Sequence, residues 1–347
     1  MTEQENPTVR GPWWWIKKIA LVLAIALVVF LLVRAFSVEK QEAGEPPQTR
    51  EDEVRLTDKT GTWQYNLLED GTASLRWELS GNTQVTVPSE VDGHAVTALG
   101  DGVFKERSKL TSVILPDGLR TIGNSTFSGC TELTAITLPD GLTAIGDSAF
   151  FRCNSLTEVT IPDSVTLIGA SAFSNCEALA HVTLPKALTE IPESLFASCK
   201  SLTKVSIPEG VTVIGTSAFS FCTNLTEVSI PKSVTSIGNE AFMGCRSLAT
   251  VYIPSGVRSI GNSAFFNCSG LVYAEIAEGT ETIGNLAFTN CSNLCSVVLP
   301  ASLTRIGDAA FHTYSLVEYK PNMDIIFTVV SGSFGETYCS QYGFRMQ

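Results

Sequence analysis

The sequence is poor in the residue types from which catalytic and metal sites are built. Its 347 residues include only three histidines, His94, His181 and His312, which are too far apart along the chain to suggest one cluster of metal ligands. It also lacks a G-x-S-x-G elbow, a P-loop and a dinucleotide fingerprint. We therefore expect surface or cap roles for the histidines, with no metal and no cofactor.

Basic residues are also scarce. The chain has 23 Lys and Arg against 35 Asp and Glu, a formal net charge of −12. Residues 1–40 carry five basic and three acidic residues, so the rest of the chain carries 18 basic and 32 acidic residues, or −14. Nucleic-acid binding needs a basic face for the phosphates. The acidic body argues against that function and leaves neutral or basic partners open.

One long apolar run lies near the N-terminus. The 15 residues from Ile19 to Val33 are all apolar, and their flanks extend the run toward the ~20 positions that a bilayer core requires. Trp13 to Trp15 lie where an interfacial aromatic belt would, and Lys17 and Lys18 place positive charge on the N-terminal side. This predicts a cytoplasmic tail over residues 1–15 and a transmembrane signal-anchor helix over 16–36. The chain would thus cross the cell membrane once, and the residues after 36 would lie outside the cell.

Two other interpretations of this run stay open, a cleaved signal peptide and a buried helix of a soluble protein. Cleavage needs a small-x-small site after the apolar run, and Arg34 and Phe36 occupy positions that should be small. A retained anchor is therefore favoured. Residues 37–55 that follow are polar and contain two prolines, a composition typical of a flexible stalk.

The remainder of the chain repeats every 23 residues. Phenylalanine marks ten successive units from Phe104 to Phe311, and cysteine marks eight from Cys130 to Cys291. Ile-Gly pairs keep the same period, with one exception at Ile191-Pro192. A typical unit reads L-T-x-V-x-I-P-x-x-V-x-x-I-G-x-x-A-F-x-x-C-x-x. A fixed period of this length indicates a solenoid built from stacked, similar coils.

The spacing within a unit predicts its local structure. Leu110-x-x-Val113-x-Leu115 has the alternation of a half-buried strand. Pro116 ends that strand because proline has no backbone N–H for the ladder. A turn then leads to an Ile-Gly bend, and we expect Phe127 to lie on a short helical turn. One coil cannot bury its seven or so apolar groups alone, so the coils must stack over residues 99–320.

Both ends of such a stack need a cap. For the N-terminal cap and first atypical coil, residues 56–98, we expect two strands around Asp70-Gly71, a hairpin signal. For the C-terminal cap, residues 321–347, we expect a strand from Ile325 to Val330. A helix from Ser333 to Tyr342, ended by Gly343, should follow it.

The repeat resembles the BspA-like leucine-rich repeats of bacterial surface proteins. The resemblance rests on the unit LTxVxIPxxVxxIGxxAFxxC and on the opening VPSEVDGHAVTALGDGVF, and it spans residues 62–347. It implies a leucine-rich-repeat solenoid of short β-strands, turns and short helical turns. Members of this family are extracellular, and several are associated with adhesion to host matrix proteins, cell aggregation and recognition by host receptors.

The cysteine ladder allows three interpretations. Metal binding needs clustered ligands in tetrahedral geometry, which a straight ladder does not offer. Disulfides between adjacent coils fit the S–S torsion poorly, because the side chains would be stacked in parallel. Buried free thiols acting as small apolar groups are favoured. Cys295 and Cys339 lie outside the ladder, and a bond between them stays open.

A candidate ligand-binding patch is formed by residues that depart from the Thr and Ser typical of the exposed strand positions. Its members, which fall on consecutive coils, are His181, Lys204, Glu227, Tyr252, Tyr273 and Glu275. Tyrosines are favoured anchors of protein interfaces. Ordinary variation of a solvated strand face is the alternative.

These features favour a non-enzymatic cell-surface protein that binds a protein or glycan outside the cell, with a role in adhesion or host interaction. One alternative is a structural scaffold for another envelope protein. Another is a β-solenoid carbohydrate-active enzyme, whose site would need converging carboxylates on loops that break the period. Every central unit here keeps 23 residues, which disfavours the enzyme.

Overall fold

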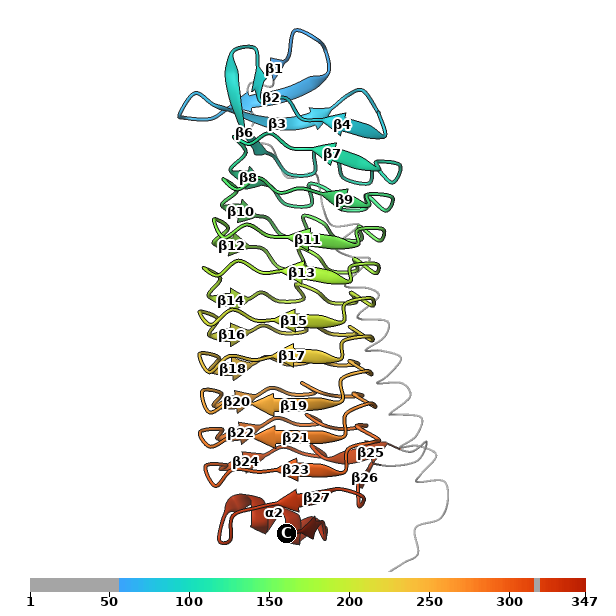
Figure 1. Ribbon diagram of the computed structural model, residues 1–347, viewed down its shortest axis with the longest axis vertical. Helices are drawn as coiled ribbons and strands as arrows, with labels where there is room; N and C mark the ends of the chain where they lie inside the picture. Colours follow the sequence, from blue (N-terminus) through green and yellow to red (C-terminus); the bar gives the residue numbers. More distant parts are fainter. Residues whose placement is uncertain (1–55, 315–318) are drawn as a thin grey trace, which may run out of the picture. The chain divides into compact units, whose positions relative to one another are not determined.

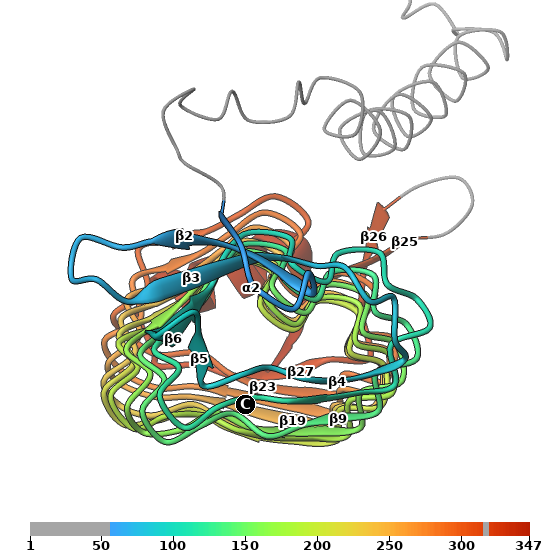
Figure 2. The same ribbon diagram turned by 90° about the horizontal axis from the view of Figure 1, so that it is seen from above.

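The computed structural model describes residues 56–314 and 319–347. The tail, transmembrane helix and stalk expected over residues 1–55 lie outside this part of the chain. Within the described residues, no helix is long enough and apolar enough to cross a bilayer. Residues 55–347 form one compact unit, and its coils stack along a single axis (Figure 1) around a common interior (Figure 2).

Each coil gives one strand to a first strand face, where the L-T-x-V-x-I segment lies. These strands are β4 (Gln84–Thr86), β7 (Ser112–Ile114), β9 (Ala135–Ile136), β11 (Glu158–Thr160), β13 (His181–Thr183), β15 (Lys204–Ser206), β17 (Glu227–Ser229), β19 (Thr250–Ile253), β21 (Tyr273–Ile276), β23 (Ser296–Val298) and β27 (Ile326–Thr328). All pairings among them are parallel, and they join equivalent residues of adjacent coils. The face therefore extends at both ends into segments that the sequence assigns to the caps.

A second strand face runs along the Ile-Gly segments, where the sequence predicts bends and no strands. Its strands are β6 (His94–Leu99), β8 (Thr121–Ile122), β10 (Ala144–Ile145), β12 (Leu167–Ile168), β14 (Glu190–Ile191), β16 (Val213–Ile214), β18 (Ser236–Ile237), β20 (Ser259–Ile260), β22 (Thr282–Ile283) and β24 (Arg305–Ile306). Most have only two residues, so the alternation that would reveal a strand is missing from the sequence.

The segment around each phenylalanine consists of turns, so the expected short helical turn is wrong. Ser125 has a φ of 53°, a left-handed conformation that cannot continue a right-handed helix. The backbone N–H of Phe127 donates to the carbonyl of Ala149 in the next coil at 2.7 Å, so it is not available to the i−4 partner of a helix. The one α-helix of the described residues is α2 (Phe334–Tyr342), in the C-terminal cap.

The core is a continuous stack of phenylalanine rings. Successive rings from Phe104 to Phe311 lie 5.0–5.8 Å apart between centroids, with interplanar angles of 3–19°. At the two ends the geometry changes to edge-on. Trp63 meets Phe104 at 87°, and Phe327 meets Phe311 at 86°. The caps thus cover the last ring faces with T-shaped contacts, a favourable aromatic geometry that also ends the stack.

The ladder cysteines are free, buried thiols, as the sequence favours. Each Sγ–H donates to the carbonyl of a phenylalanine in the preceding coil, for example from Cys222 to Phe196 at 3.2 Å. That carbonyl also accepts the backbone N–H of Cys199, so the thiol uses its second lone pair. Burial raises the pKa of Cys176 and of Cys222 to about 12, which keeps these thiols protonated and unreactive.

The two caps contain the hairpin and the helix that the sequence predicts. β1 (Leu56–Thr57), β2 (Trp63–Leu67) and β3 (Ala73–Glu78) pair antiparallel, and β3 continues in parallel onto β6. β5 (Glu90–Val91) adds a second small hairpin to β6. At the other end, β25 (His312–Tyr314) pairs with β26 (Tyr319–Pro321). Ser333 caps α2 by accepting from the Glu336 N–H, Gly343 ends it at φ 72°, and β28 (Arg345–Met346) follows.

Replacing Gly238 by alanine should destabilise the solenoid. An added Cβ would lie 2.7 Å from backbone atoms of Gly215 and Thr216 in the preceding coil, so two coils would have to separate. Overpacking of this kind costs roughly 1–3 kcal/mol. Gly118 is the matched control, because its added Cβ would be 3.7 Å from the nearest atom. Urea unfolding should show a lower midpoint for Gly238→Ala only, and equal midpoints would contradict the close stacking.

Thiol counting tests the ladder directly. The native protein, prepared without reductant, should expose one reactive thiol, because Cys295 is exposed and the other nine cysteines are buried. After unfolding in the same unreduced state, all ten should react. Cys295→Ser should abolish the native signal and leave nine thiols on unfolding. A count below ten in the unfolded wild-type protein would reveal disulfides and contradict the structure.

Candidate binding face

The six residues of the predicted patch all lie on the first strand face, but in two columns. Strand register aligns His181 with Glu158, and Lys204 with Glu227, in the first column. Tyr273 belongs to the same column but is separated from Glu227 by Thr250. Tyr252 and Glu275 are paired with each other in the second column, two residues further along their strands. The patch therefore crosses the face diagonally over β13, β15, β17, β19 and β21.

Two pairs of side chains within the patch already interact. Lys204 Nζ lies 2.7 Å from Glu227 Oε2, with both side chains largely exposed, so this ion pair contributes about 0–1 kcal/mol. Tyr273 donates its hydroxyl to Glu275 Oε2 at 2.8 Å, and this hydrogen bond, together with burial, raises the tyrosine pKa. Tyr252 has 50% of its surface exposed. It presents the largest apolar surface of the patch to a ligand.

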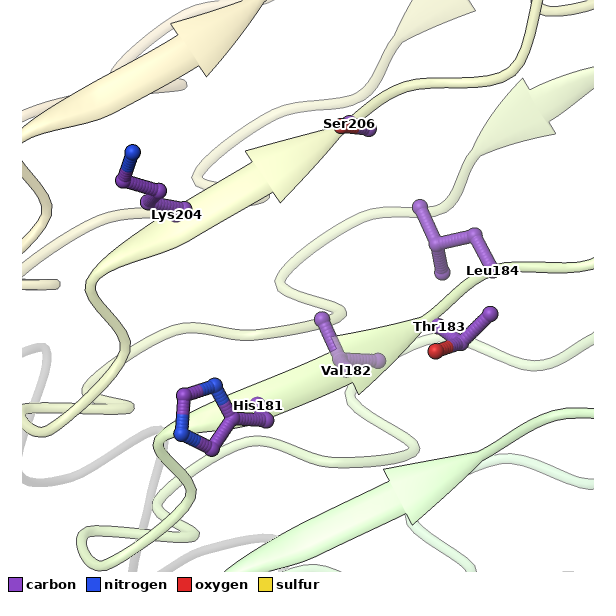
Figure 3. Close-up of a pocket in the computed structure, with 6 residues that line it drawn as sticks. All are labelled: His181, Val182, Thr183, Leu184, Lys204 and Ser206. Carbon is purple, nitrogen blue, oxygen red and sulfur yellow. The ribbon is translucent and has the colours of Figure 1, made fainter.

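A hollow opens between β13 and β15, inside the patch. It has a volume of about 430 Å³ and is lined by His181, Val182, Thr183, Leu184, Lys204 and Ser206. Figure 3 shows His181 and Lys204 at one end, Thr183, Leu184 and Ser206 toward the other, and Val182 between them. Val182 is half-buried, whereas the equivalent Val159 and Val205 are each only 3% exposed. The hollow thus combines charged and polar rims with an apolar floor.

The hollow coincides with a break in the strand pairing. The first strand face is interrupted at three junctions of the described coils, and one of these lies between β13 and β15. The second strand face of the described residues is interrupted once, between β12 and β14. Both this interruption and the one between β13 and β15 separate the coil that contains β14 and β15 from the preceding coil. Pro192 occupies the position of the repeat glycine there. Gly169 and Gly215 donate their N–H groups to Ile145 and Ile191 of the preceding coils, and proline has no N–H to donate.

A second departure from the repeat increases the spacing of this coil from its neighbours in the core. Leu195, fully buried, stands where both neighbouring coils have alanine, Ala172 and Ala218. The rings of Phe173 and Phe196 are 5.8 Å apart and those of Phe196 and Phe219 5.7 Å, against 5.0–5.3 Å along the rest of the stack. We call residues 186–208 the wedge coil. Its extra core volume and its missing hydrogen bond explain why its strands β14 and β15 are unpaired with β12 and β13 of the preceding coil, whereas they pair with β16 and β17 of the next coil.

Of the other residues singled out in the sequence, His94, His312 and Cys339 lie in or beside the caps, and Cys295 directly precedes β23 of this face. His94 Nδ1 contacts the carbonyl of Gly71 at 2.9 Å in the N-terminal cap. His312, on β25, is buried beside Tyr342 of the C-terminal cap, and burial lowers its pKa. Cys295 is exposed and Cys339 buried, both as free thiols. Across the described ranges, His, Cys, Asp and Glu nowhere gather in a group of three able to hold a metal ion.

Comparison with known proteins assigns the family. The profile described as "BspA type Leucine rich repeat region" (6 copies) matches residues 97–226 and 212–334. The chain belongs to the BspA-type leucine-rich repeat family. This is a repeat-protein fold, and the match indicates no catalytic family. No curated protein matches the chain significantly.

Solved structures of other leucine-rich repeat proteins share the solenoid. A leucine-rich repeat protein from Bacteroides ovatus is 25% identical, with a TM-score of 0.59, over 77% of this chain and 83% of its own. A protein described as a leucine rich cell surface protein, from Faecalibacterium prausnitzii, is 27% identical, with a TM-score of 0.50, over 84% of this chain and 98% of its own.

Returning the wedge coil to the repeat pattern should close the hollow. The double change Pro192→Gly and Leu195→Ala restores an N–H donor toward Ile168 and removes the extra core volume. Hydrogen exchange by mass spectrometry should then show slower exchange at residues 203–206, with residues 227–229 as the internal reference. Because the coils can close over the vacated space, the stability cost should fall at or below the lower end of the ~2–5 kcal/mol typical of Leu→Ala. Unchanged exchange at 203–206 in a folded double variant would refute the wedge explanation.

Proposed function

We propose that this protein is anchored in the cell membrane through residues 16–36 and binds a protein or glycan outside the cell, without catalysis. Adhesion or host interaction is the role we favour. The binding element is the first strand face from β13 to β21. The observation that carries the proposal is that the hollow between β13 and β15 and the exposed residues of the patch occupy the same stretch of this face.

The chemistry of the face supports protein recognition. Tyr252 offers a rigid aromatic surface with a polar tip, the type of residue that dominates many interface energies. Lys204 and Glu227 satisfy each other in the free protein, so a ligand must either keep this pair or replace both partners. The hollow can receive one apolar side chain on Val182, with His181 and Thr183 available for hydrogen bonds at its rim.

The family relationship supports the location at the cell surface. A structural relative from Faecalibacterium prausnitzii is described as a cell surface protein. The apolar run from Ile19 to Val33 provides a means of attachment. An acidic body also suits a soluble domain outside the membrane, where it favours neutral or basic partners.

Binding to the patch can be tested by screening the purified full chain against matrix proteins, envelope proteins and glycans on a biosensor. For a bound ligand, the triple change of Lys204, Tyr252 and Tyr273 to alanine should weaken affinity more than about tenfold, because interface hot spots commonly contribute 2 kcal/mol or more. Trp77→Ala is the matched control, since Trp77 in the N-terminal cap is exposed to the same 50% as Tyr252.

Three outcomes are informative. Loss of affinity in the triple variant but not in Trp77→Ala supports both the function and the face. Equal affinity in the triple variant leaves a binding protein but rejects this face. A folded chain that binds none of the extracellular ligands, yet co-purifies with one envelope protein after cross-linking in cells, would replace adhesion by a scaffold role.

A further inference from the structure

A second polar groove lies on the other strand face, away from the patch. It has a volume of about 290 Å³ and spans the Ile-Gly segments of the coils that contain β18, β20, β22 and β24. Gly261 and Gly284 form part of its floor. These glycines are required by the close approach of coils, since an added Cβ would lie within 2.6 Å of backbone atoms of the preceding coil.

One wall of the groove is a ladder of asparagines. Asn239 Oδ1 accepts the backbone N–H of Asn262, and Asn262 Oδ1 accepts that of Asn285, each at 2.8 Å. Asn285 Oδ1 in turn accepts the N–H of Asp308 at 2.9 Å. These bonds fix the orientation of each amide, with its oxygen toward the protein backbone. The Nδ2 groups of these three asparagines form no hydrogen bond with any residue that the structure describes, and Asn239 and Asn262 are exposed, so their N–H donors are available to a ligand.

The groove also contains an exposed cation. Arg305, on β24, lines the groove next to Thr282, its register partner on β22. Arg305 forms no ion pair with any residue that the structure describes, whereas the nearby Arg258 is paired with Glu281 at 3.0 Å. Asp308 closes the ladder beyond Asn285. Apart from the buried Ile260 and Ile283, the side chains that line the groove are amides, one hydroxyl group and one guanidinium, on a body that is otherwise acidic.

The same ladder has a different character in the N-terminal coils. There Asp101, Asn124 and Asp147 occupy the equivalent column and accept the equivalent N–H groups at 2.7–2.8 Å. A carboxylate therefore supports the coil as well as an amide does. The structural role does not require asparagine. Unlike aspartate, the consecutive asparagines at 239, 262 and 285 add N–H donors to the groove without adding negative charge.

We propose that this donor groove, defined by Asn239, Asn262, Thr282, Asn285 and Arg305, binds a carboxylate-bearing saccharide such as a uronic acid unit. The guanidinium of Arg305 would pair with the carboxylate in a bidentate geometry. The amides and the Thr282 hydroxyl would hydrogen-bond the sugar hydroxyls. Successive amides repeat at about the 4.8 Å spacing of adjacent coils, which suits a polymer that presents similar groups at regular intervals.

A saccharide fits the groove better than a peptide does. Extended peptides usually bind by adding a strand to an open sheet edge or by filling apolar pockets. The strands β18, β20 and β22 are paired on both sides by neighbouring coils. Ile260 and Ile283 are buried, so the groove offers no open apolar surface for a peptide side chain. The volume lies near the lower end of the roughly 300–1,000 Å³ of ligand sites, so it holds a small unit of a chain. This site is independent of the patch on the first strand face.

The experiment is calorimetric titration of the full chain with trigalacturonate, beside its methyl ester and a polyglutamate peptide. Trigalacturonate should bind, and the ester should bind at least tenfold more weakly because the carboxylate is masked. Asn262→Asp should reduce binding at least tenfold while the ladder stays intact, since Asp147 fills the same role in its own coil. Arg305→Ala should reduce it similarly. Asn124→Asp, the same change in the N-terminal coils, should leave binding unaltered.

Three results would overturn the proposal. Failure of the folded wild-type chain to bind trigalacturonate removes the site. Binding that is equal in Asn262→Asp and wild type removes the asparagine wall from it. Tighter binding of polyglutamate than of trigalacturonate would replace the saccharide by an acidic peptide. Thermal melts of each variant, expected to match wild type, distinguish lost binding from lost folding.

Discussion

The structure depends on one constraint, that each coil completes its backbone hydrogen bonds on the next coil 23 residues away. The N–H of Phe127 donates to Ala149, that of Phe150 to Ala172, and so on along the stack. No single coil could satisfy these groups or bury its phenylalanine alone, so stability comes from neighbours. The caps are necessary because the stack leaves one ring face open at each end, and Trp63 and Phe327 cover those faces.

The same constraint converts position in the repeat into position in space. Residues 23 apart fall into columns of rings, thiols, amides or exposed side chains. Columns of Phe, Cys and Gly are needed for stacking and carry little information about a ligand. Departures from the repeat are what differ between coils, and here they gather in two places. Pro192 and Leu195 open the first strand face near the patch. Arg305 adds a positive charge to the donor groove on the second strand face.

Much of the fold could be predicted because its signals are local or strictly periodic. The Asp70-Gly71 turn marked the first hairpin, and Ser333 with Gly343 marked both ends of α2. The second strand face was not predicted because strands such as Thr121–Ile122 are too short to show an alternation of apolar and polar residues. The turns at Phe127 were not predicted because Ser125 adopts a left-handed conformation. A serine in a sequence gives no sign of this conformation, unlike a glycine.

The candidate site was predicted in composition but not in shape. Counting in steps of 23 already separates Tyr252 from the column of Glu227, and the register shows the two columns directly. The hollow between β13 and β15 could not be read in this way. It depends on how the volume of Leu195 and the missing N–H of Pro192 act together on the spacing of the rings around Phe196.

We propose that departures from the repeat, aligned by the coil register, form the surface that binds a protein ligand. Hydrogen exchange of the full chain, with and without a saturating protein ligand, tests this most directly. The account predicts that protection on binding appears at residues 181–184, 204–206 and 250–276. Protection confined to the turns or to the second strand face, with these segments unchanged, would contradict it.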